Sequence, residues 1–205
     1  MKILKILQIS ILVLVAILFS FFMLNFSKKN EVRHEQTTEK TEKYIENFEL
    51  TDQDNNVFSF DSLNKYYKLV YFGFTYCPDI CPASLNKINN ILKDLNRYKY
   101  SNFKMIFISV DPKRDTPEKL KLYLGHFNKD IIGLTSDDEN KIKKVVDQFG
   151  AYYQVAPNED DPENYMVNHT SFIYLIDKDG RYINHFHLDN KYEEIIDYVV
   201  KNKLK

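Results

Sequence analysis

Two kinds of hydrophobic pattern alternate along the chain. Short apolar runs rich in β-branched and aromatic residues predict strands at residues 56–60, 68–74, 104–110 and 170–176. Apolar positions that recur every three to four residues predict helices at residues 82–98, 116–127, 138–149 and 192–201. Strands that alternate with helices are typical of an α/β fold.

Two short motifs refine this arrangement. The turn sequence DKDG at residues 177–180 joins the strand at residues 170–176 to a further strand at residues 181–186. Antiparallel strands should therefore follow the earlier crossover connections. Asp115 or Thr116, placed directly before a Pro-Glu pair, predicts the start of a helix, because proline suits the first helical position.

One long segment near the N-terminus, residues 6–26, carries no charge. At about 1.5 Å of helical rise per residue it covers the ~30 Å hydrocarbon core of a bilayer. A cleaved signal peptide is the alternative, but the run is longer than usual for one and ends without a small-x-small cleavage site. We therefore expect residues 1–26 to be an uncleaved anchor that contacts the lipid bilayer. Basic residues on both sides of the segment do not fix its orientation.

The rest of the chain divides into a polar stretch and a larger region of mixed composition. Residues 27–43 contain one apolar residue among charges of both signs, which predicts a solvated linker. Residues 44–205 carry the strand and helix patterns and are expected to form one domain. The whole chain of 205 residues is 44% hydrophobic with a net charge of −1, so no basic field is available to hold nucleic acid.

The two cysteines, Cys77 and Cys81, lie together where a predicted strand gives way to a helix. The carboxyl end of such a strand is the usual ligand crevice of α/β folds, and free N–H groups at a helix start lower the pKa of a thiol. A four-residue spacing puts the two Cα atoms roughly 6 Å apart on a helical turn, which allows either a disulfide or a shared metal ion. Because Pro82 disfavours a helical residue before it, we expect the regular helix to begin only at Pro82.

Two other interpretations of the cysteine pair are weaker. One is a buried structural disulfide or a pair of inert core thiols. A disulfide that closes so short a loop would add little to the stability of the fold. A peroxidase nucleophile would need a Thr or Ser three residues before the cysteine, whereas Thr75 lies two before Cys77. Away from the pair, His185 and His187 are two residues apart on a predicted strand and so share one face of it. We expect this face to be a solvated surface in preference to a second metal site.

Three motifs follow one another along the chain, namely GFTYCPDICP at residues 73–82, SVDPKRDTP at residues 109–117 and VNHT at residues 167–170. Together they resemble the Sco/SenC family over residues 46–200. The resemblance implies a thioredoxin-like domain on a membrane anchor. It further implies a copper chaperone that helps to assemble the binuclear copper site of cytochrome c oxidase, and hence the oxidase subunit carrying that site as a partner.

By position, the resemblance implies that Cys77, Cys81 and His169 are the copper ligands. Two soft thiolates and one imidazole suit three-coordinate Cu(I), whereas zinc in a structural site would need a fourth ligand. His169 would be carried over the cysteines by a loop before the strand at residues 170–176. The family usually has His in place of Tyr76 and Asp in place of Asn168, and neither of these positions is a ligand position.

Alternatives to a non-enzymatic chaperone use the same cysteines. A thiol-disulfide reductase would act by exchange between Cys77 and Cys81 and would not need His169. A copper or redox sensor would share the whole site. A cysteine pair that cycles belongs on the oxidising side of a membrane, so the resemblance implies the periplasmic face of a bacterial inner membrane or the intermembrane-space face of the mitochondrial inner membrane. Low Gly and abundant Lys, Asn and Ile favour the bacterial location.

Overall fold

The structure is a computed structural model that describes residues 14–23, 42–202 and 204. Residues 14–23 are helical with exposed side chains. Within the described part of the chain, no helix has the length and apolar character needed to cross a membrane. The remainder of the predicted anchor at residues 6–26, and residues 27–41 of the predicted linker, lie outside the described residues, so the anchor stays a prediction.

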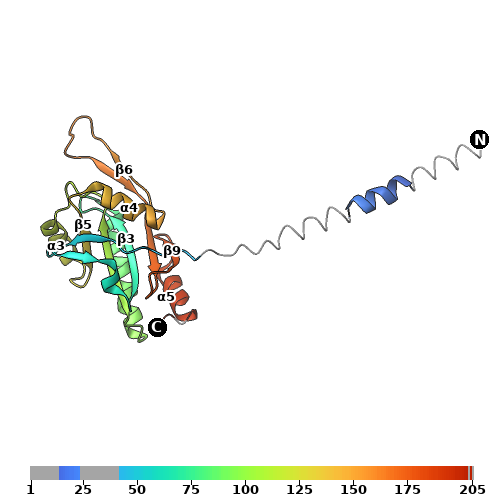
Figure 1. Ribbon diagram of the computed structural model, residues 1–205, viewed down its shortest axis with the longest axis horizontal. Helices are drawn as coiled ribbons and strands as arrows, with labels where there is room; N and C mark the ends of the chain where they lie inside the picture. Colours follow the sequence, from blue (N-terminus) through green and yellow to red (C-terminus); the bar gives the residue numbers. More distant parts are fainter. Residues whose placement is uncertain (1–13, 24–41, 203, 205) are drawn as a thin grey trace, which may run out of the picture. The chain divides into compact units, whose positions relative to one another are not determined.

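Residues 42–205 contain a seven-stranded mixed sheet (Figure 1). Its strand order is β2 (Val57–Ser59), β1 (Glu49–Asp52), β5 (Ile132–Thr135), β4 (Phe103–Ser109), β3 (Tyr67–Gly73), β8 (Phe172–Ile176) and β9 (Tyr182–His187). The central strands β3, β4 and β5 are parallel, whereas β8 and β9 are antiparallel additions beside β3. Two further strands, β6 (Tyr153–Ala156) and β7 (Met166–His169), pair only with each other.

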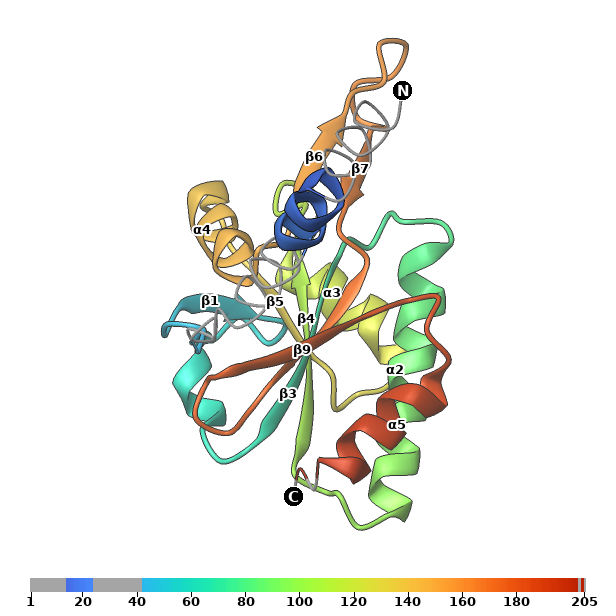
Figure 2. The same cartoon turned by 90° about the vertical axis from the view of Figure 1, so that its right-hand side faces the viewer.

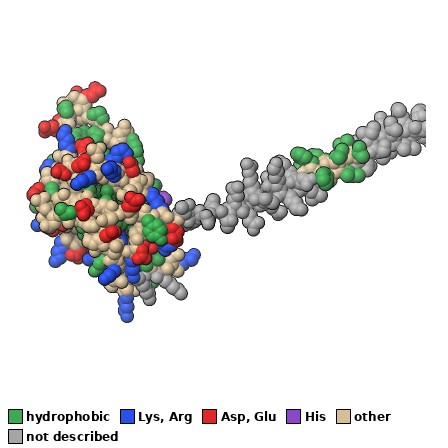
Figure 3. Space-filling view, viewed as in Figure 1, with side chains coloured by type: hydrophobic (Ala, Val, Ile, Leu, Met, Phe, Trp, Pro, Cys, Tyr) green, Lys and Arg blue, Asp and Glu red, His purple; other side chains and the backbone are tan. Residues whose placement is uncertain are grey.

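Helices cover both faces of this sheet. They are α2 (Ile80–Arg97), α3 (Pro117–Gly125), α4 (Glu139–Phe149) and α5 (Tyr192–Lys201), with a 3-10 turn η1 (Phe60–Leu63) after β2. Figure 2 shows α2, α3 and α5 on one side of the sheet and α4 on the other. The β6–β7 hairpin projects from the sheet, and Figure 3 shows acidic side chains at its tip, where residues 157–165 connect the two strands.

The α/β class and most of the expected elements are confirmed. The four predicted strands correspond to β2, β3, β4 and β8, and the turn at residues 177–180 leads into β9 as expected. Thr116 caps α3 by accepting a hydrogen bond from the Lys119 backbone N–H over 3.4 Å. Four strands were not predicted, namely β1, β5, β6 and β7. Each has only four residues, and a pattern that short cannot be told reliably from a loop.

The predicted start of α2 is wrong. The helix begins at Ile80, so Cys81 lies in its first turn instead of on a preceding loop. The proline is tolerated because the first N–H groups of a helix have no partner within the helix. The first helical bond, from Ala83 N–H to Asp79 C=O over 3.1 Å, forms beyond it.

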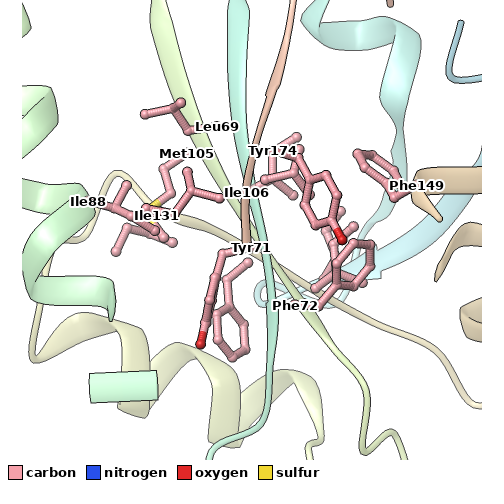
Figure 4. Packing of buried hydrophobic residues seen from close by; sticks show 14 of the residues in the cluster. Leu69, Tyr71, Phe72, Ile88, Met105, Ile106, Ile131, Phe149 and Tyr174 are labelled. Carbon is pink, nitrogen blue, oxygen red and sulfur yellow. The ribbon is translucent and has the colours of Figure 1, made fainter. Parts of the chain in front are cut away.

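The core is packed on both faces of β3 (Figure 4). Leu69 and Tyr71 point toward α2 and Ile88, whereas Phe72 points to the opposite face, where it meets the Phe149 ring at 5.3 Å between centroids. All of these side chains are at most 2% exposed. Close packing on both sides fixes β3 in place. It therefore also fixes the point at which the chain leaves β3 and enters the turn at residues 74–79, called the cysteine turn below because it carries Cys77.

Candidate metal centre

Three side chains from separate elements converge at the carboxyl end of β3. Cys77 lies in the turn between β3 and α2, Cys81 lies in the first turn of α2, and His169 is the last residue of β7. Their candidate ligand atoms all lie within 4.8 Å of one another. In the part of the chain that the structure describes, no other group of three or more His, Cys, Asp or Glu side chains has this arrangement. The structure thus brings together the three residues that the sequence singled out.

The element that carries His169 differs from the prediction. It is β7 of a hairpin, and not a loop before β8, that places the imidazole over the cysteines. The His169 Nε2 atom lies 3.5 Å from Cys81 Sγ. Its Nδ1 lies 3.2 Å from the Thr170 carbonyl oxygen, which only accepts hydrogen bonds, so Nδ1 carries the proton. The Nε2 lone pair is therefore free to face the thiols, an orientation that suits a metal ligand.

Cys77 is the more accessible thiol and has the more acidic environment. It is half-buried, and its Sγ accepts a hydrogen bond from the Cys81 backbone N–H over 3.4 Å at the free end of α2. A hydrogen bond from the Cys81 thiol is the main cause that lowers the pKa of Cys77 to about 4, and the Cys81 backbone N–H acts in the same direction. The expectation that the helix start favours a thiolate is confirmed at this position.

Cys81 does not follow that expectation. Its thiol is fully buried, and its hydrogen bond to Cys77, together with burial, raises the pKa of Cys81 above its usual value. The prediction that both thiols are acidified is therefore wrong for Cys81. The physical reason is that a second negative charge beside the Cys77 thiolate, away from water, is unfavourable unless a cation compensates it.

The Cys81 thiol sits in a closely fitted site on the sheet. The Tyr71 hydroxyl lies 3.8 Å from Cys81 Sγ and accepts a hydrogen bond from Ser84 Oγ over 3.1 Å. Gly73 leaves room for the sulfur, since a Cβ atom there would lie 2.9 Å from Cys81 Sγ and 2.8 Å from the Phe107 ring. The sequence analysis missed Tyr71 as a neighbour of the site, although its place two residues before Gly73 on the same strand face is a usable signal.

The loop after β4 holds the cysteine turn through hydrogen bonds. The buried Asp115 carboxylate accepts hydrogen bonds from the Thr75 backbone N–H over 3.0 Å and from the Thr75 hydroxyl over 2.6 Å. It also accepts one from the Ser109 hydroxyl over 2.7 Å. These bonds tie the chain just before Cys77 to the end of β4.

The remaining histidines on β9 do not join the site. His185 and His187 are exposed on one face of that strand, and both rings pack against Phe172. His185 Nδ1 lies 2.7 Å from the Tyr182 hydroxyl, and His187 pairs with Asp189 at 3.0 Å. These contacts agree with the expected surface role.

Comparison with known proteins identifies relatives over most of the chain. A family model for SCO1/SenC matches residues 36–203. The SCO2-like protein of Rickettsia felis is 43% identical over 197 residues, which covers 96% of this chain and 95% of that protein.

Solved structures share the fold. Bradyrhizobium japonicum ScoI with copper bound is 37% identical, with a TM-score of 0.68, over 77% of this chain and 98% of that chain. BsSco, a member of the Sco family of cytochrome c oxidase assembly proteins, is 27% identical, with a TM-score of 0.64, over 81% of this chain and 96% of that chain. These matches confirm the thioredoxin-like α/β fold that the resemblance implied.

Proposed function

The chain belongs to the SCO1/SenC family, and from this premise we propose that it is a membrane-anchored copper metallochaperone. Its cargo is copper, held by Cys77, Cys81 and His169, and its recipient is the subunit that carries the binuclear copper site of cytochrome c oxidase. The observation that carries the proposal is the convergence of two sulfurs and one imidazole nitrogen within 4.8 Å. The copper-bound relative and the assembly role of the family support the choice of metal and recipient.

The donor set selects a soft ion. Thiolates bind Cu(I) in preference to hard cations such as Mg²⁺ or Ca²⁺, and three ligands complete its coordination. Cys77 is already acidic, whereas Cys81 must lose its proton when the ion binds. The positive charge of the ion supplies the compensation that the buried Cys81 thiolate lacks, so copper binding releases a proton from this site.

The difference in exposure between the two sulfurs suggests how copper leaves. Cys77 is half-buried and Cys81 is buried, so an incoming thiolate of the recipient reaches the ion from the Cys77 side. The new sulfur–copper bond replaces the bond to Cys77 while Cys81 and His169 still hold the ion. Copper therefore passes between proteins without being released into water.

One observation favours a second activity, that of a thiol-disulfide reductase. Cys77 combines accessibility with a low pKa, which is the usual condition of an attacking thiolate. In that reaction the Cys77 thiolate attacks a partner disulfide to form a mixed disulfide and releases one partner thiolate. Cys81, after losing its proton, attacks Cys77 Sγ, which releases the second partner thiolate and leaves a Cys77–Cys81 disulfide. The pair is oxidised by two electrons and the partner is reduced by two.

His169→Ala separates the two activities, because the imidazole is needed for copper but not for thiol exchange. Loss of one direct ligand should lower Cu(I) affinity by at least the tenfold to hundredfold that changes around metal ligands cause. Copper loading of the oxidase should fall with it, while disulfide reduction by Cys77 and Cys81 persists. Affinity is measured on the full chain by competition with a chromophoric Cu(I) chelator.

The exposed His185 offers a matched control, because His185→Ala removes an imidazole from the same domain at a position away from the cysteines. It should leave copper affinity unchanged. If His169→Ala behaves like His185→Ala while Cys77→Ser abolishes oxidase assembly, the chaperone proposal fails and the reductase takes its place.

We further propose that residues 6–26 anchor the chain in a bacterial inner membrane with the domain in the periplasm. The uncharged sequence and the redox chemistry of the site support this location.

A further inference from the structure

Arg114 lies in the loop between β4 and α3 and is enclosed by aromatic rings from two other segments. Its guanidinium carbon lies 3.6 Å from the centre of the Tyr165 ring and 4.5 Å from the centre of the Tyr76 ring. The side chain is only 10% exposed, and its Nε donates to Asp111 Oδ2 over 2.5 Å. A largely desolvated cation over the faces of two aromatic rings is a favourable cation–π arrangement.

The two rings belong to the two segments that carry the metal ligands. Tyr76 directly precedes Cys77, and Tyr165 directly precedes β7, which ends at His169. The Tyr165 hydroxyl donates to Asp111 Oδ1 over 2.6 Å. Arg114 therefore sits at the junction of the cysteine turn, the loop after β4 and the β6–β7 hairpin.

A third ring brings this junction next to the imidazole. Phe74 is fully buried, and its ring lies 5.9 Å from the Arg114 guanidinium carbon and 5.8 Å from the His169 ring centre at an angle of 89°. On the outer side, Lys119 Nζ donates to the Tyr76 hydroxyl over 3.2 Å. The Tyr76 ring is thus held by cations from two different segments.

We propose that Tyr76 and Arg114 are positioning residues for the metal centre: through the stacked guanidinium they fix the strand bearing His169 relative to the turn bearing Cys77. The inference rests on the proposed copper function of these three ligands. A site that is held in its binding geometry before the ion arrives loses less conformational freedom on binding, and this raises affinity.

The test compares Tyr76→Leu with Tyr76→Phe in the full chain in detergent. Phe keeps the ring face over Arg114, whereas Leu removes it. Cu(I) affinity, measured by chelator competition, should fall about 2-fold to 30-fold in Tyr76→Leu, the range that corresponds to one cation–π contact. Tyr76→Phe should retain wild-type affinity. The matched control is Tyr98→Leu, at a 60% exposed tyrosine at the end of α2, which should change nothing.

A second measurement on the metal-free protein makes the test independent of copper. Amide hydrogen exchange in β7 should be faster in Tyr76→Leu than in wild type, and unchanged in Tyr76→Phe. Equal copper affinity and equal β7 exchange in Tyr76→Leu and wild type would overturn the inference. Equal losses in the Leu and Phe variants would also overturn it, because the hydroxyl rather than the ring would then be responsible. If wild type binds no copper, the proposed function fails, and the exchange data still decide the positioning role.

Discussion

Gly73→Ala tests how closely the sheet is fitted around the buried thiol. The added Cβ would lie 2.9 Å from Cys81 Sγ and 2.8 Å from Phe107 Cε2, whereas carbon atoms in van der Waals contact prefer about 3.5–4.0 Å. Both neighbours are fully buried, so neither has solvent to move into. The backbone of Gly73 does not have a positive φ, and the clash alone is responsible for the effect.

The expected magnitude follows from the cost of overpacking a closed core, which is about 1–3 kcal/mol. For a domain of this size, each kcal/mol corresponds to roughly 2–4 °C, so the melting temperature should fall by about 2–12 °C. Because both contacts are shorter than 3.0 Å, relief of the clash moves Cys81 Sγ as well as the Phe107 ring. We therefore expect Cu(I) affinity to fall as well, since one ligand atom is displaced from the other two.

Two assays and one control decide the prediction. Chemical denaturation gives the free energy of unfolding, and chelator competition gives the affinity of the folded protein. Gly125→Ala is the control, because no atom lies within 4 Å of a Cβ at this position at the end of α3. In a helix that change should be neutral or stabilise by up to about 1 kcal/mol. If Gly73→Ala is as stable as wild type and binds copper equally well, the close fit described here is refuted.

Two further predictions concern other parts of the chain. Burial lowers the pKa of Lys68, whose Nζ donates to the Asp177 carbonyl over 2.9 Å, so the unfolded chain binds its proton more tightly than the folded one. The free energy of unfolding should therefore increase as pH rises toward about 10.5, and this increase should be absent in Lys68→Met. Chemical denaturation of both proteins at ~pH 8 to 11 measures it, and an identical pH slope in the two would contradict the prediction. For the anchor, protease added to spheroplasts should digest the domain, and the full chain should keep its N-terminus; a mature N-terminus near Ser27, or a protected domain, would show the anchor prediction to be wrong.

The sequence was sufficient for the elements whose pattern is long enough to read. Strands β3 and β4 have seven residues each and consist largely of buried apolar side chains, so their runs stand out without any tertiary information. The helices α4 and α5 carry a clear apolar stripe for the same reason. The hairpin between β8 and β9 was predictable because its turn residues are local.

Local pattern was insufficient where partners are distant or strands are short. β5 has four residues and takes its place between β4 and β1, with partners such as Ile106 and Thr51 that are far from it in sequence. The start of α2 was mispredicted because the local preference before Pro82 was weighed without the tolerance of a helix's first turn. For β5 the deciding contacts lie outside the window that a sequence pattern covers, whereas for α2 the deciding feature is local and was misjudged.

The candidate site shows the same division. The sequence by itself determined that two thiols lie at a strand-to-helix junction and, through the motif that contains His169, which imidazole belongs with them. Only the tertiary structure decided that β7 carries that imidazole to 3.5 Å from Cys81, and that one thiol is acidic while the other is not. It also decided that the Arg114 guanidinium lies over the rings of both Tyr76 and Tyr165. Distance, burial and charge coupling arise from residues that meet only after folding, so no local pattern encodes them.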